Sequence, residues 1–180
     1  MPRPAPPPLR VNRAPVLALR AAVVAERVGH PEETALTLGS AVAGTAARAK
    51  TRRLGVAEDR QGDDGQRRRG DAAGGERRAA RLLGRDIPVA RADGGLLLAA
   101  HDGQPQSPSA VRNYLARASG DRLDEVRGAM EALAASLPPD ELDRVGFRLH
   151  ERFRPEVPEG VEGWGAKAVL DIGRIRRAAD

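Results

Sequence analysis

Four basic side chains within six residues form the first group in this sequence that could do chemistry. Arg48, Lys50, Arg52 and Arg53 lie close together, and guanidinium and ammonium groups bind the phosphates of nucleic acids. We therefore take these four residues as candidate nucleic-acid contacts. The alternative is that they complement the negative C-terminal end of a helix and stay solvated.

Sequence motifs for catalytic, cofactor-binding and metal-binding sites are weaker than this basic run. Residues 44–51 resemble a phosphate-binding loop, but Ala49 stands where a second glycine is needed, and no apolar strand comes before it. His30, His101 and His150 are isolated, and no serine lies in a Gly-x-Ser-x-Gly elbow. The sequence thus nominates no catalytic, cofactor-binding or metal-binding residue, and it favours a protein that is not an enzyme.

The single tryptophan is a second candidate site. Trp164 stands between two glycines after a Pro-containing loop. The favoured interpretation is an apolar plug that holds the C-terminal segment against the helices. The alternative is an exposed anchor for a protein partner.

The basic run must be positioned by a helix pair over residues 12–55. Asn12 is the expected N-cap of the first helix, Gly29 ends it, and Pro31 opens the second. The pair partly matches a helix-turn-helix, with Ala25 four residues before Gly29. Glutamates at the leading end of the second helix would repel phosphates, so bihelical packing without DNA contact is favoured over a DNA reader.

The rest of the chain divides by composition. Residues 1–11 read as a disordered Pro-rich tail and residues 56–75 as a flexible linker. In residues 76–180 we expect a short helix at Glu76–Leu83 and a small β-hairpin. The hairpin strands are Ile87–Arg91 and Leu96–Ala100, with Pro88 suited to an edge strand.

Helices are predicted for most of the remainder. Ser107, Asp121 and Asp171 are the expected caps of three of them. Two apolar stripes on either side of Pro138-Pro139 predict an antiparallel C-terminal helical hairpin. The fold class is therefore mostly α, with a helix-turn-helix-like pair, a small hairpin and this helical hairpin. The stripes consist of Leu123, Val126, Met130, Leu133 and Leu137, and of Leu142, Val145, Leu149 and Phe153.

Composition limits the function classes. The chain has 180 residues, a formal charge of +5 and no cysteine, which excludes disulfides and thiolate metal sites. Lys50 and Lys167 are its only lysines, so the basic character reflects arginine and permits a polyanion partner without requiring one. The apolar run Val16–Ala25 is too short to span a bilayer. We expect a cytoplasmic protein that does not engage membranes.

At these residues a family resemblance is visible. Residues 12–55, together with Trp164-Gly165-Ala166-Lys167, resemble a family of uncharacterised bacterial proteins. That family often carries an aromatic side chain where this chain has Arg20, a departure that bears on local packing. The resemblance implies a folded domain and no particular activity.

Two functions from different classes are expected. The first is a non-enzymatic interaction or regulatory module that acts through helical surfaces, with a protein partner or a second copy of itself. A homodimer would use the small-residue face of Gly39, Ala43 and Ala46. The alternative is a nucleic-acid-binding protein that uses the helix pair and the basic end of its second helix.

Overall fold

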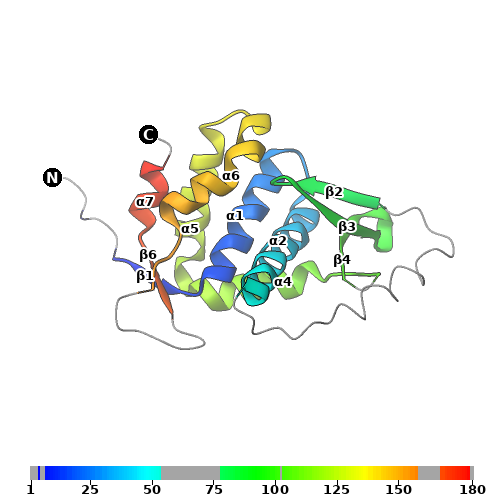
Figure 1. Cartoon of the computed structure of the whole chain (residues 1–180), viewed down its shortest axis with the longest axis horizontal. Helices are drawn as coiled ribbons and strands as arrows, with labels where there is room; N and C mark the ends of the chain where they lie inside the picture. The colour runs from blue at the N-terminus through cyan, green and yellow to red at the C-terminus, as the bar shows by residue number, and fades with distance from the viewer. Residues whose placement is uncertain (1–3, 5–6, 54–77, 102, 158–166, 179–180) are drawn as a thin grey trace.

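The computed structural model describes residues 4, 7–53, 78–101, 103–157 and 167–178, without the side chains of residues 45–53. This part of the chain is mostly helical, as predicted, with a four-stranded antiparallel sheet at one end (Figure 1). The elements are β1 (Leu9–Val11), α1 (Arg13–Arg27), α2 (Glu32–Arg53), β2 (Arg78–Leu82), β3 (Arg85–Arg91), a 3-10 turn (Asp93–Gly95), β4 (Leu97–His101), β5 (Gln104–Pro105), α4 (Pro108–Ser119), a second 3-10 turn (Gly120–Arg122), α5 (Leu123–Ala135), α6 (Pro139–Phe153), β6 (Ala168–Leu170) and α7 (Ile172–Arg177).

Helix α1 is the centre of the fold. Every residue from Pro15 to Ala25 is buried except Leu17, which is partly exposed. The helices α2, α4, α5 and α6 all contact it (Figure 1). A helix that is apolar on all sides must be enclosed by other elements. The small Ala and Val side chains of α1 let several helices approach it at once.

The two N-terminal helices meet backbone to backbone. Gly29 ends the first with a φ of 112°, a conformation that favours glycine. A Cβ atom added at Gly39 would lie 2.8 Å from the backbone nitrogen of Ala22. Gly39 is therefore packed against α1 of its own chain, and Ala43 is also buried. This corrects the expectation that Gly39 and Ala43 offer an open face to a second copy.

The first turns of α2 are covered by β4. Thr34 Oγ1 donates a hydrogen bond to the carbonyl of Leu97 at 2.6 Å. Thr37 Oγ1 accepts from the amide of Ala99 at 2.9 Å. Residues 34–38 are all buried, whereas Pro31, Glu32 and Glu33 at the leading end are exposed. The predicted helix pair is confirmed, and its use as a DNA reader stays a prediction.

The predicted hairpin is confirmed as β3 and β4, within the larger sheet β2-β3-β4-β5. The helix predicted over Glu76–Leu83 is wrong, because Arg78–Leu82 form the strand β2. Leu83 and Gly84, with φ values of 53° and 74°, make a two-residue turn that pairs β2 with β3. Pro88 lies in the inner strand β3 instead of an edge strand, but its registered partner is in β2 and it has none in β4.

The C-terminal helices do not form the antiparallel hairpin that was predicted. Helices α5 and α6 both pack against α1 and α7 rather than along each other. Their apolar stripes are buried as expected, with Val126, Met130, Leu142 and Phe153 nearly inaccessible.

The predictions for the helix caps and the N-terminal tail are confirmed only in part. Ser107 and Asp171 cap α4 and α7 as predicted, by accepting from Ala110 N at 3.2 Å and Gly173 N at 2.9 Å. Asn12 makes no capping hydrogen bond, and Arg122 replaces Asp121 as the N-cap of α5. Leu9–Val11, assigned to the tail, form β1 and pair with β6. The linker predicted at residues 56–75 lies outside the described residues.

No helix in the described part of the chain is long and apolar enough to cross a membrane.

Candidate functional site

The residues nominated from the sequence lie where the structure gives no side-chain geometry. The backbone of Arg48, Lys50, Arg52 and Arg53 belongs to the last turns of α2, and their side chains are outside the description. Trp164 lies outside the described residues altogether. Neither site is therefore tested by the structure.

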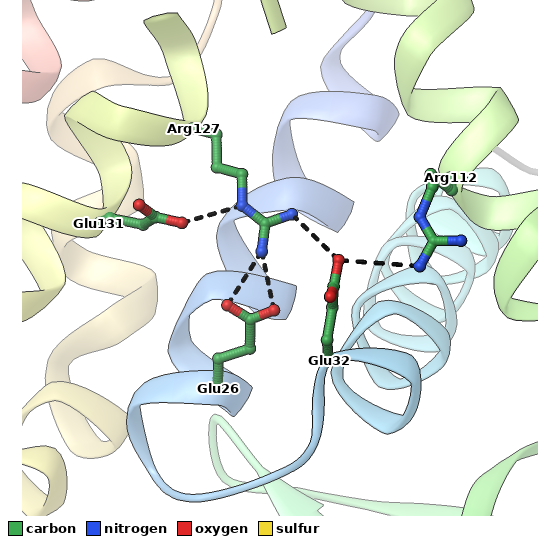
Figure 2. A network of polar contacts seen from close by, with 5 residues as sticks. All are labelled: Glu26, Glu32, Arg112, Arg127 and Glu131. Carbon is green, nitrogen blue, oxygen red and sulfur yellow. Dashed lines mark hydrogen bonds and ion pairs between the residues drawn. The ribbon is translucent and has the colours of Figure 1, made fainter. Parts of the chain in front are cut away.

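The turn between α1 and α2 is held by an ion-pair network (Figure 2). Arg127 on α5 donates to both carboxylate oxygens of Glu26, at 2.8 and 3.0 Å, and to Glu131 at 2.9 Å. Glu32 at the start of α2 lies 3.7 Å from Arg112 and 4.0 Å from Arg127. Burial acts to lower the pKa of Arg127, but its hydrogen bond to Glu131 and the charge of Glu26 outweigh burial and raise it.

This network gives the acidic start of α2 a structural role. Glu32 forms ion pairs with two arginines, Arg112 of α4 and Arg127 of α5. The network fastens the α1–α2 turn to two later helices (Figure 2). The charges of this network are thus accounted for by the packing of the helices. We therefore place the candidate site elsewhere.

Three arginines line a surface pocket where α6 and α7 end. The pocket has a volume of about 200 Å³ and is lined by Arg152, Arg174, Arg177 and Ala178. We call this set the arginine pocket. Both helices run their C-terminal ends to this place, and cations are stabilised near the negative end of a helix dipole. The negative helix ends themselves oppose an anion, so the three guanidinium groups alone supply the positive charge that can receive one at this concave surface.

Each arginine of the pocket has a partner within the chain. Arg152 Nη1 donates to the carbonyl of Ala178 at 3.2 Å. Arg174 pairs with Glu156 at 3.3 Å, and Arg177 pairs with Asp171 at 3.3 Å. The side chains of these two ion pairs are between 39% and 67% exposed. Exposed pairs of this kind contribute roughly 0–1 kcal/mol, so an incoming anion can replace them at little cost.

A second unusual group lies in the interior, where α6 crosses α1 (Figure 1). Arg20 is 1% exposed, and its guanidinium carbon lies 5.9 Å from the centre of the Phe153 ring. Among the described residues, none of its three guanidinium nitrogens has a hydrogen-bond partner. Burial lowers the pKa of Arg20 to about 10, which still leaves it charged at neutral pH.

His150 completes this interior group. Its ring packs edge-on against Phe153 with 5.4 Å between ring centres. Its Nδ1 atom is buried and has no partner within the described chain. Burial and the positive charges of Arg20 and Arg154 lower the pKa of His150 to about 4. An uncompensated buried charge costs several kcal/mol, which a cation–π contact near the 6 Å limit does not offset.

Sequence reasoning missed both groups. The arginines of the pocket are separated by 21 residues of sequence between Arg152 and Arg174, and arginine is frequent along the whole chain. The one available signal for the interior group was Arg20 itself, which interrupts the apolar run of the first helix. Nothing in the sequence indicated that His150 lies beside it.

The described residues include no set of three or more His, Cys, Asp or Glu side chains arranged to hold a metal ion. Comparison with known proteins adds no assignment, since no family model, curated protein or solved structure matches this chain.

Proposed function

We propose that this chain is a non-enzymatic interaction module that binds an acidic segment of a partner protein at the arginine pocket. The observation that carries the proposal is the convergence of Arg152, Arg174 and Arg177 around one pocket of about 200 Å³. A space of this size accepts one or two carboxylate groups. Guanidinium groups bind carboxylates through paired, directional hydrogen bonds.

The existing ion pairs support exchange with a partner. Glu156 and Asp171 already show that carboxylates satisfy Arg174 and Arg177. Because both pairs are largely solvated, a partner carboxylate can take their place without leaving a buried charge unpaired. The partner's additional contacts would then raise its affinity for the pocket, and the positive surface would attract the acidic segment as it approaches.

A protein partner is favoured over nucleic acid at this pocket. Glu156 and Asp171 lie beside the arginines and would repel the continuous line of phosphates in a nucleic acid. A peptide can place single carboxylates between these groups. Nucleic-acid binding through Arg48, Lys50, Arg52 and Arg53 stays the alternative proposal, and it involves a different part of the surface.

A binding titration tests the proposal. The probes are a fluorescent peptide that carries two glutamates separated by neutral residues and a fluorescent mixed-sequence DNA duplex, followed by anisotropy at low and high salt. We expect the peptide to bind and to weaken as salt rises, because exposed charges are screened. The triple variant Arg152→Ala/Arg174→Ala/Arg177→Ala should weaken peptide binding at least about tenfold.

The matched control removes the same charge elsewhere. Arg91, Arg117 and Arg144 are exposed residues of β3, α4 and α6, and their triple alanine variant should keep peptide affinity within about twofold. Equal losses in both triple variants would mean that only net charge matters. Tight, salt-sensitive binding of the duplex without peptide binding would favour the nucleic-acid alternative.

Other expectations from the sequence remain proposals. We also propose that Trp164 is a further partner anchor, that the protein is cytoplasmic, and that it is related to the family of uncharacterised bacterial proteins that it resembles. Self-association is the alternative to a foreign partner, and light scattering at two concentrations decides it. A homodimer would need a surface other than the one around Gly39, which α1 already covers.

A further inference from the structure

Two polar side chains without partners lie against the same aromatic ring inside the fold. Arg20 comes from the middle of α1, and His150 comes from the last turns of α6. Both contact the ring of Phe153, at 5.9 Å for the guanidinium carbon and 5.4 Å for the imidazole centre. Within the described chain, their buried nitrogen atoms have no hydrogen-bond acceptor or donor. Buried polar groups in folded proteins are almost always satisfied, so an unsatisfied pair indicates something that binds there.

The net charge of Arg20 and His150 indicates which kind of ligand they would bind. Arg20 is protonated at neutral pH, and His150 is neutral there because its pKa is lowered to about 4. The group therefore carries a single positive charge, which one negative charge balances. Five guanidinium N–H groups and, in one neutral tautomer, the His150 Nδ1–H can donate hydrogen bonds to that anion.

We infer that Arg20 and His150 hold one small monovalent anion, a chloride ion or a carboxylate group, between α1 and α6. The anion is small because Arg20 and Phe153 are each only 1% exposed. His150 is the member of the group that keeps part of its surface accessible. This site is separate from the arginine pocket and does not depend on the proposed function.

The first experiment measures stability against anion identity. Unfolding is followed in urea at constant ionic strength while sodium gluconate is replaced by sodium chloride or sodium formate. Gluconate is too bulky for an enclosed site. We expect the wild-type midpoint to rise and then saturate with chloride or formate, as binding to the folded state alone requires. In Arg20→Met, which keeps an unbranched apolar stem and removes the charge, the rise should disappear.

The second experiment reads the site directly. NMR of histidine-labelled protein follows the titration of His150 with and without chloride or formate. A bound anion favours the charged imidazole and should raise the pKa of His150 by about one unit. Arg20→Lys, which keeps the positive charge, should retain part of this response. That variant keeps the test decisive should Arg20→Met fail to fold.

A control separates this site from the surface. The double variant Arg174→Ala/Arg177→Ala removes charge from the arginine pocket and should leave both anion responses unchanged. The inference is overturned by an unmoved His150 titration, or by equal anion responses in the wild type and Arg20→Met. A wild type that is indifferent to all three anions also overturns it.

Discussion

At the residue scale, the proton affinity of His150 links the interior of the fold to solution pH. Burial and the charges of Arg20 and Arg154 lower its pKa from 6.5 to about 4. An unfolded chain keeps the ordinary imidazole pKa. Between these two values the unfolded state binds a proton that the folded state does not, so stability falls as pH falls. The stability that the folded protein owes to a neutral His150 is fully present above about pH 6.5 and fully lost below about pH 4.

We therefore predict that lowering the pH from 7.5 to 4 in chloride-free buffer costs roughly 2–3 kcal/mol of unfolding free energy through His150. His150→Phe should remove this part of the pH dependence, while His30→Gln should keep it. The measurement is the urea midpoint of the three proteins across this range. Identical pH dependence in the wild type and His150→Phe would contradict the prediction.

Gly39 offers a second test at this scale. A Cβ atom there meets the backbone of α1 at Ala18 and Ala22, and backbone cannot move aside as a flexible side chain can. Gly39→Ala should therefore destabilise the protein by about 2–4 kcal/mol. Gly44 lies in the same helix with open space around it, so Gly44→Ala should stabilise by about 0.5–1 kcal/mol. Thermal or urea unfolding compares the two, and the same sign for both would show that α1 and α2 are farther apart.

At the scale of elements, two threonine hydroxyls join α2 to the sheet. Thr37 Oγ1 accepts from the Ala99 amide at 2.9 Å and donates to the Thr34 carbonyl at 2.9 Å. The β5 partners of β4 lie further along, at Ala100 and His101. The hydroxyls of α2 thus satisfy backbone groups of β4 that no neighbouring strand reaches on that side.

Thr37→Val keeps the shape of this side chain and removes the hydroxyl. The buried Ala99 amide would lose its acceptor, and we predict a loss of about 1–3 kcal/mol. Thr37→Ser keeps the hydroxyl and should lose less. Urea unfolding gives the energies, and hydrogen exchange at the Ala99 amide reports the bond itself. Unchanged exchange in Thr37→Val would exclude this role for the hydroxyl.

The sequence predicted elements where local chemistry decides the outcome. The caps at Ser107 and Asp171, the stop at Gly29 and the turn at Asp93–Gly95 each depend on a few adjacent residues. Prediction from the sequence was wrong where contacts with distant segments decide the secondary structure. Arg78–Leu82 become a strand because β3 pairs with them, which overrides local helix preference.

The candidate site was beyond sequence reasoning for the same reason. The arginine pocket exists only because the ends of α6 and α7 meet, and no local pattern fixes that meeting. Arg20 broke an apolar run in the sequence, but its missing partner can be seen only when α6 is in place beside it.

At the scale of the whole molecule, the two candidate sites share one region. The arginine pocket lies on α6 and α7, and the interior group lies between α1 and α6. The helix α7 and the β1–β6 ribbon occupy the end of the molecule opposite the four-stranded sheet (Figure 1). The sheet end is held by α2 through Thr34 and Thr37, and by α6 through Asp143, which accepts from the Leu83 amide at 2.6 Å.

The central position of α1 also has a consequence for synthesis on the ribosome. This helix is made first, yet α5 and α6, which cover much of it, come from residues 123–153. At ordinary translation rates of about 5–20 residues per second, its apolar faces wait on the order of ten seconds for their partners. Pairing of β1 with β6 comes later still. The faces of α1 that α5 and α6 cover are therefore exposed in the nascent chain until those two helices have been made.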